Sequence, residues 1–190
     1  MPASLFRPTS DLLVQYATYH RDPRNIVSHF IGIALIVLAV GVLLARVQLG
    51  PLSLAWGVWA LATAWYCTRG KLALGLATSA VNAALIALAH ALADAPAHAL
   101  AHALAAASMA IWLAWGIGLF VLGWLIQFVG HWWEGRKRAF VDDIVGLLVG
   151  PMFVVAEWLL ALGWNAPLAA EIKRRAGPAR RRSTSSTAAG

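Results

Sequence analysis

Two groups of polar side chains stand out in this otherwise apolar chain because their residue types bind metal ions. The first group is His20, Asp22, Asn25 and His29, and the second is Gln127, His131 and Glu134. A continuous helix would place all three members of the second group on one face, because they are spaced by four and three residues. Imidazole with carboxylate suits iron, zinc or copper, and nitrogen and oxygen donors with open positions are typical of non-haem iron oxygenases. The pattern permits iron without identifying it.

The cysteine content narrows the choice of ligands. Cys67 is the only cysteine, and it lies within an apolar stretch. Neither a disulfide framework nor a thiolate metal site can form within one such chain. Any metal bound here must therefore use nitrogen and oxygen ligands.

The composition is that of a membrane protein. The chain has 190 residues, of which 61% are hydrophobic and only 12% are charged, whereas soluble domains carry about 25% charged residues. The formal net charge is +7, but the basic residues stand between apolar stretches and in a C-terminal run, without interleaved aromatic residues. Charge that flanks membrane spans explains these residues, so we expect no nucleic-acid partner and a lipid bilayer as the surroundings.

Membrane-spanning helices must position the two polar groups, and each span needs about 20 apolar residues. Four stretches satisfy this length, at about residues 26–45, 49–67, 72–93 and 109–129. Arg46 and the Arg-Gly-Lys turn at 69–71 separate the first three. The sequence therefore predicts an all-α, polytopic membrane bundle with four spanning helices.

A fifth apolar stretch, from Ile144 to Leu162, is ambiguous. Gly150-Pro151 interrupts it, and Glu157 would place an acid near the middle of the membrane. A full crossing would also export the basic residues that follow it. We therefore predict a partly inserted C-terminal hairpin at 144–164, folded against the bundle.

The chain is predicted to form a single membrane domain over residues 1–170. Residues 171–190 contain too few apolar side chains to bury and enough charge to stay solvated. We predict a disordered basic tail for this segment.

Basic residues set the orientation, because cytoplasmic loops carry an excess of Lys and Arg. With four crossings and both termini inside, the cytoplasmic side collects Arg7, Arg21, Arg24, Arg69, Lys71, Arg136, Lys137, Arg138 and the six basic residues of the tail. Arg46 alone lies outside. Both polar groups then lie at the cytoplasmic face, and the alanine- and arginine-rich composition favours a bacterial inner membrane, or the endoplasmic reticulum if the protein is eukaryotic.

Inward-facing imidazoles from the two groups can converge on one ion, because neighbouring helix axes in a bundle are roughly 8 to 10 Å apart. A lone histidine at a membrane boundary is more often an interfacial hydrogen-bonding residue, but three histidines and a glutamate at one face favour a site. His90, His98 and His102 form a rival set on the opposite side, in an alanine-rich stretch, and we interpret them as structural or incidental. Glu157 is either a capping or interfacial acid or a partner of a ligating histidine.

Two segments at these same residues resemble a known family. Residues 16–32, YATYHRDPRNIVSHFIG, resemble the N-terminal signature of the membrane-bound 2-hydroxy fatty acid dioxygenases of fungal phytosphingosine degradation and their bacterial relatives. Residues 127–134, QFVGHWWE, then Ala139 and the segment PMFVVAE at 151–157, resemble the family's C-terminal signature in order and spacing. The two matches bracket residues 16–158.

The resemblance implies the chemistry and the ligands. The family binds ferrous iron through histidines and converts a 2-hydroxy fatty acid and oxygen to a fatty acid one carbon shorter. Carried over, His20, His29 and His131 become the expected ligands of Fe(2+). The chain departs from the family at Ala34 and Arg138, where proline is usual, and this affects local backbone shape because proline fixes φ and removes an N–H.

Further roles follow as hypotheses. A 2-hydroxy carboxylate can chelate a metal through its carboxylate and hydroxyl oxygens, and Arg21 or Arg24 would neutralise that carboxylate. Glu134 would be a fourth ligand or orient His131. We therefore expect Glu134, Asn25 and Arg24 to act in catalysis.

Two other function classes remain as alternatives. A small transporter would need ionisable residues near mid-membrane on several helices, whereas the four predicted spans are almost uncharged at their centres. A non-catalytic membrane scaffold would hold a structural metal in a closed site and consume no oxygen.

Overall fold

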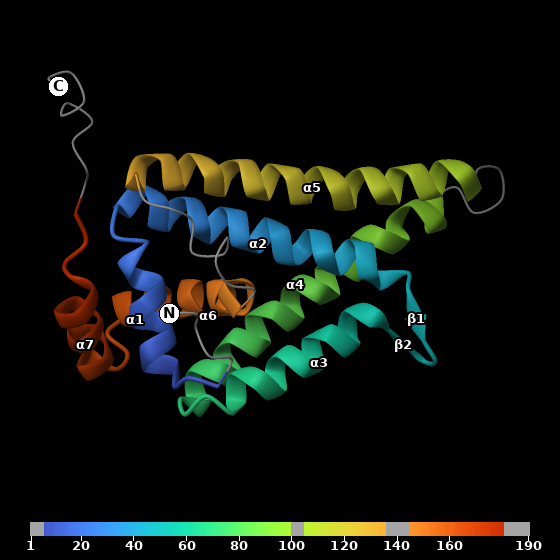
Figure 1. The fold of residues 1–190 in the computed structure, drawn as a ribbon. Helices are drawn as coiled ribbons and strands as arrows, with labels where there is room; N and C mark the ends of the chain where they lie inside the picture. The colour runs from blue at the N-terminus through green and yellow to red at the C-terminus, as the bar shows by residue number, and fades with distance from the viewer. Residues whose placement is uncertain (1–5, 100–104, 136–144, 181–190) are drawn as a thin grey trace, which may run out of the picture.

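The computed structural model describes residues 6–99, 105–135 and 145–180, and most of them are helical (Figure 1). In chain order the elements are α1 (Thr9–Thr18), α2 (Pro23–Ala45), β1 (Gln48–Leu49), β2 (Leu52–Ser53), α3 (Leu54–Cys67), α4 (Leu72–Ala99), α5 (Ala105–Glu134), α6 (Val145–Ala161) and α7 (Ala166–Ala176). Helices α2, α3, α4 and α5 alternate in direction, each running back along the bundle relative to the one before it (Figure 1). The start of α2 and the end of α5 therefore lie at the same end of the bundle.

Among the described residues, three helices are long and apolar enough to cross a membrane. They are Pro23–Ala45 in α2, Leu72–Asp94 in α4 and Met109–Glu134 in α5. The bent pair α6 and α7 makes a fourth candidate if it counts as one broken span. Only 11% of the most apolar 18-residue stretch of α5 is buried inside the protein, so most of its apolar surface faces outward. The protein is an all-α polytopic membrane bundle, as the sequence predicts.

The second predicted span is shorter than expected. Helix α3 has 14 residues, or about 21 Å at 1.5 Å per residue, against a hydrocarbon thickness of about 30 Å. The preceding residues form an antiparallel hairpin in which Leu49 pairs with Leu52, and Gly50 has a φ of 65° in its turn. The prediction of a helix over 49–67 is therefore wrong for its first residues, because Gly50-Pro51 closes a hairpin there.

The start of α2 is fixed by local capping. Asp22 is the N-cap, and its carboxylate accepts a hydrogen bond from the backbone N–H of Arg24 at 2.9 Å. Pro23 occupies the first helical position, where its missing N–H costs nothing. The helix therefore begins three residues earlier than predicted and includes Asn25, so that Asn25 and His29 lie one turn apart on it.

Helix α5 packs closely on α2 through glycines spaced by seven residues, at Gly116, Gly123 and Gly130. A Cβ on Gly123 would lie 2.8 Å from the carbonyl oxygen of Gly32 on α2. Small residues let membrane helices approach at backbone distance. This contact brings together the side chains at the start of α2 and the end of α5.

The C-terminal region differs from the predicted hairpin. Pro151 lies inside α6 instead of breaking it, and the chain bends by 117° only between α6 and α7. Gly163, with a φ of 86°, lies in this connection. The predicted tail starting at 171 overlaps α7, in which Ile172 is buried, while residues 181–190 lie outside the described residues.

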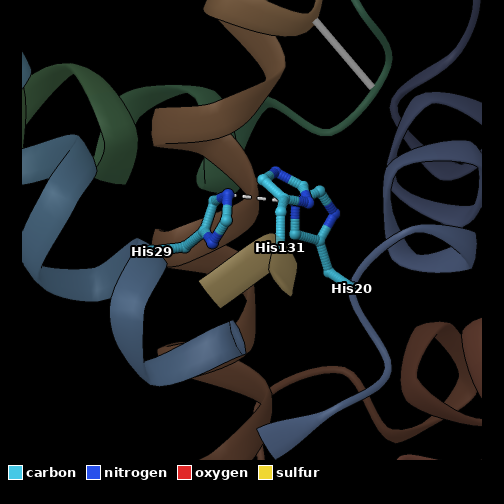
Figure 2. A group of neighbouring side chains, drawn as sticks. All are labelled: His20, His29 and His131. Atoms are coloured by element: carbon cyan, nitrogen blue, oxygen red, sulfur yellow. Dashed lines mark hydrogen bonds between the residues drawn. The ribbon is translucent and has the colours of Figure 1, made fainter. Parts of the chain in front are cut away.

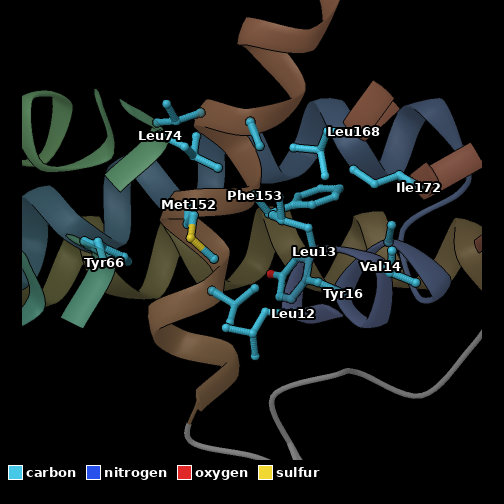
Figure 3. Close-up of a cluster of buried hydrophobic side chains, with 14 of the residues drawn as sticks. Leu12, Leu13, Val14, Tyr16, Tyr66, Leu74, Met152, Phe153, Leu168 and Ile172 are labelled. Carbon is cyan, nitrogen blue, oxygen red and sulfur yellow. The ribbon is translucent and has the colours of Figure 1, made fainter. Parts of the chain in front are cut away.

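A hydrophobic core packs α1 against α6 and α7 (Figure 3). Leu12, Leu13, Met152 and Phe153 are almost fully buried within it. Helix α1 is also tied to the α3–α4 turn, because the N–H of Thr9 donates to the carbonyl of Arg69 at 2.9 Å. The loop between α1 and α2 is thereby held over the ends of the bundle.

Candidate metal centre

Three buried histidines from three elements meet at one point (Figure 2). His20 comes from the loop between α1 and α2, His29 from α2 and His131 from α5. Each offers one ring nitrogen, and these three nitrogens all lie within 4.8 Å of one another. Among the described residues this is the group of His, Cys, Asp and Glu side chains that could hold a metal ion.

The hydrogen bonds of two of these histidines define their tautomers. The Nδ1 of His20 lies 2.7 Å from the carbonyl oxygen of Tyr16, and the Nδ1 of His29 lies 2.8 Å from that of Asn25. A carbonyl only accepts hydrogen bonds, so each Nδ1 must carry the proton. Each Nε2 then presents a lone pair.

The two Nε2 atoms lie 3.0 Å apart. If both are unprotonated, no hydrogen bond joins them, and two lone pairs directed at one small volume fit a cation. Burial, with a smaller contribution from His29, holds the pKa of His20 well below its usual range, which favours this neutral form. Backbone carbonyls that fix the far ring nitrogen are the usual support of metal-binding histidines. The donor set therefore fits a divalent transition metal.

Glu134 holds the loop that carries His20. Its Oε2 accepts hydrogen bonds from the backbone N–H of Arg21 at 2.9 Å and of Asp22 at 2.8 Å, and from the Nδ2 of Asn25 at 3.2 Å. This oxygen of Glu134 thus joins α5 to the α1–α2 loop and to α2. The contacts position His20, whereas the sequence reasoning considered only a fourth ligand or a partner of His131.

The two arginines beside the site have different surroundings. Arg24 donates through Nε and Nη2 to the carboxylate of Asp22, at 3.0 and 2.8 Å, and lies over the ring of Trp133. The Nε of Arg21 is buried and has no hydrogen-bond partner among the described residues. Burial lowers the pKa of Arg21, while the charges of Glu157 and Glu134 oppose this shift. Glu157 therefore lies near Arg21.

Two further residues lie beside the histidines. The ring of Tyr16 stacks on that of His20, with centroids 4.2 Å apart and planes at 5°. Sequence reasoning missed Tyr16, although its spacing of four residues from His20 on a helix was a readable signal. Gln127, a member of the second polar group, is buried one turn before His131 and lines a small cavity with Tyr16.

His90, one of the rival histidines, lies at the other end of the bundle. His90 uses both ring nitrogens in hydrogen bonds, to the carbonyl of Ile86 and to the hydroxyl of Ser53, each at 2.8 Å. It fastens α4 to the start of α3. His102 lies outside the described residues, as does the side chain of His98.

The fold and the geometry define a class: a polytopic helical membrane protein with three buried imidazoles that could hold a metal ion. The family model described as 2-hydroxy-palmitic acid dioxygenase Mpo1-like matches residues 6–162. The chain belongs to this Mpo1-like family.

A curated relative agrees with the family match. It is the 2-hydroxy-palmitic acid dioxygenase MPO1 of Saccharomyces cerevisiae, 30% identical over 173 residues, which cover 84% of this chain and 88% of the yeast protein. No solved structure matches the chain. The family match, over residues 6–162, spans α1 to α6 and therefore includes all three histidines.

Proposed function

We propose that this protein is an iron(II)-dependent dioxygenase that converts a 2-hydroxy fatty acid and O2 to a fatty acid one carbon shorter. The observation that carries this proposal is the pair of Nε2 atoms of His20 and His29, 3.0 Å apart beside His131 in a buried site. The yeast relative is named a 2-hydroxy-palmitic acid dioxygenase, and this supports a 2-hydroxy fatty acid as the substrate class.

The overall reaction balances without a further reductant. A 2-hydroxy acid, RCH(OH)COOH, and O2 give RCOOH, CO2 and H2O. The bond between the first and second carbons breaks, the hydroxyl-bearing carbon is oxidised to a carboxyl, and the substrate loses the four electrons that reduce O2. The protein must bring both substrates together and keep competing water away.

The residues fit a ferrous ion held by His20, His29 and His131. Bound iron would supply open positions at which the hydroxyl and carboxylate oxygens and O2 meet. Burial of all three imidazoles excludes bulk water from this point. We assign Glu134 and Asn25 as positioning residues, since their side chains bond to each other and Glu134 also holds the loop of His20.

Arg21 is the better candidate to receive the substrate carboxylate. Its Nε is buried without a hydrogen-bond partner, and a charge-assisted bond to a carboxylate would satisfy it. Arg24 is instead engaged with Asp22. Of the two arginines predicted for this role, we therefore assign the carboxylate contact to Arg21, with Arg24 fixing the N-cap of α2.

The site is proposed to face the cytoplasm. Arg21, Arg24 and Arg69 lie at the end of the bundle that carries the histidines, as the hydrogen bond from Thr9 to the carbonyl of Arg69 indicates. Arg46 lies at the opposite end, where it donates to the carbonyl of Ala93 at 2.6 Å. An excess of basic residues on one side marks the cytoplasmic face.

Oxygen uptake by detergent-purified protein tests the proposal. Protein given ferrous iron and 2-hydroxypalmitate should consume O2 and release the acid one carbon shorter with CO2. The variants H20A, H29A and H131A should lose bound iron and product together. Stoichiometric zinc, or no metal, with no oxygen uptake would favour a structural-metal scaffold instead.

A further inference from the structure

A large apolar cavity, partly open to the outside, lies between the helices of the bundle beyond the metal centre. Its volume is about 370 Å³, within the range of small-molecule sites. Residues from α2, α3, α4, α5 and α6 line it, among them Val40, Leu44, Val58, Ala62, Ile86 and Phe120. The polar groups of two of its aromatic residues are already engaged, because Trp59 donates to the carbonyl of Ser79 and Tyr66 to that of Leu148. The cavity therefore suits an alkyl chain.

A small space beside this cavity lies among neighbours of the histidines. It has a volume of about 50 Å³ and is lined by Tyr16, Ile33 and Gln127, and it shares further lining residues with the large cavity. Tyr16 stacks on His20. Ile33 lies one turn after His29, and Gln127 one turn before His131. The small space is thus lined by residues adjacent to each of the three histidines.

One face of α2 connects the two ends of this path. His29, Ile33, Val40 and Leu44 follow one another at helical spacing, so they share that face. From His29 to Leu44 the helix rises about 22 Å at 1.5 Å per residue. The path is therefore long enough for most of a long alkyl chain and lies nearly parallel to the helices.

We propose that the alkyl tail of a long-chain 2-hydroxy acid occupies this cavity, with its head at the three histidines, and that α2 residues in the lining set the accepted chain length. This inference rests on the proposed function. Val37 and Val40 lie about 12 and 16 Å beyond His29 along the helix. A bulky side chain at each position would therefore limit the alkyl chain to a different length.

A groove on the outer side of α2 and α5 is the rival place for the tail. It has a volume of about 340 Å³ and is lined by Arg24, Val27, Ile31 and Val129. Val27 and Ile31 are 58% and 50% exposed. They lie on the face of α2 opposite that of His29 and Val40, so a chain in this groove would not extend from beneath the histidines.

Chain-length profiles of three matched variants separate the two places. Val37→Phe and Val40→Phe should each lower kcat/KM for 2-hydroxypalmitate by tenfold or more relative to shorter 2-hydroxy acids, since a mismatch of one methylene in an apolar pocket already costs about 10- to 200-fold. The cut-off length should be shorter for Val37→Phe. Val27→Phe, the same change in the outer groove, should leave the profile unchanged. A shifted profile in Val27→Phe alone would overturn the proposal.

Photolabelling gives a readout that needs no turnover. A 2-hydroxypalmitate analogue with a diazirine at the end of its chain should label peptides of α3 and α4 that contain Val58 and Ile86. Labels at Val27 or Val129 would overturn the cavity assignment whatever the activity. Labels in the cavity without oxygen uptake would instead refute the proposed reaction and keep the cavity as a lipid-tail site. The labelling result also stands if a phenylalanine variant fails to fold.

Discussion

Both ends of the helical bundle contain histidines, but their ring nitrogens are used differently. His90, at the end with the β-hairpin, has both ring nitrogens in hydrogen bonds to Ile86 and Ser53. His20 and His29, at the other end, are each held by Nδ1 alone and direct Nε2 toward one shared point. A histidine with both nitrogens satisfied by protein stabilises the fold, whereas one anchored on a single side is prepared to bind an ion.

Histidine removal at the two ends should give the largest difference. His29→Ala should abolish both iron binding and oxygen uptake, because it removes one of three converging ligands. His90→Ala should bind iron as the native protein does. Metal analysis of both purified variants checks this, and iron loss in His90→Ala as well would show that general unfolding, not ligation, links histidines to the metal.

Loosening the loop that carries His20 should have the next largest effect. Glu134→Ala removes the acceptor of three hydrogen bonds and should weaken iron binding or turnover by about 10- to 100-fold, the usual effect of losing a group that supports a ligand. Glu134→Gln keeps an acceptor oxygen and should lose less. Glu171 is 34% exposed and pairs with Arg175 one turn along α7, so Glu171→Gln serves as the control. Unchanged iron titration in Glu134→Ala would remove its positioning role.

The spacing of α2 and α5 should affect stability more than chemistry. Gly123→Ala places a Cβ 2.8 Å from the carbonyl oxygen of Gly32 and should destabilise the protein by about 1–3 kcal/mol through overpacking. Gly118→Ala, on the same helix, meets nothing within 4 Å and should be neutral or slightly stabilising because alanine favours helix. Thermal unfolding in detergent compares them. Equal stability would mean that the glycine contact does not set the distance between His29 and His131.

The smallest effect on activity should come from a change at the end of the bundle that contains the β-hairpin and His90. Ser53→Ala removes the hydroxyl partner of His90 and should cost about 1 kcal/mol of stability, typical for one hydrogen bond. Oxygen uptake should remain at the native level. A loss of turnover without a loss of stability would show that this end communicates with the metal centre.

Much of the site was predictable because its residues lie at helix ends fixed by hydrophobicity and charge. The alternation of spans predicts that the polar groups around His29 and His131 share one membrane face, and the family resemblance selects His20 as their companion. The three side chains do lie together. That they bind iron stays a prediction.

The other features of the fold and site were not predicted. Some depend on tertiary contacts, and others had a sequence pattern that the prediction did not use. The spacing of Gly116, Gly123 and Gly130 was readable as a helix-packing face. The partners of Glu134 were not readable, because they are backbone groups far away in sequence. Pro151 predicted a break that the packing of α6 overrides, and Gly50-Pro51 shortens α3 through a hairpin that hydrophobicity alone does not reveal.

The stoichiometry of a protein loaded anaerobically with one ferrous ion per chain tests the central claim most directly. On admission of O2 with 2-hydroxypalmitate, the account predicts one O2 consumed for each shortened acid and each CO2 formed, without an added reductant. Turnover that proceeds equally well after the iron is removed, or iron-loaded protein that consumes no O2 with this substrate, would contradict it.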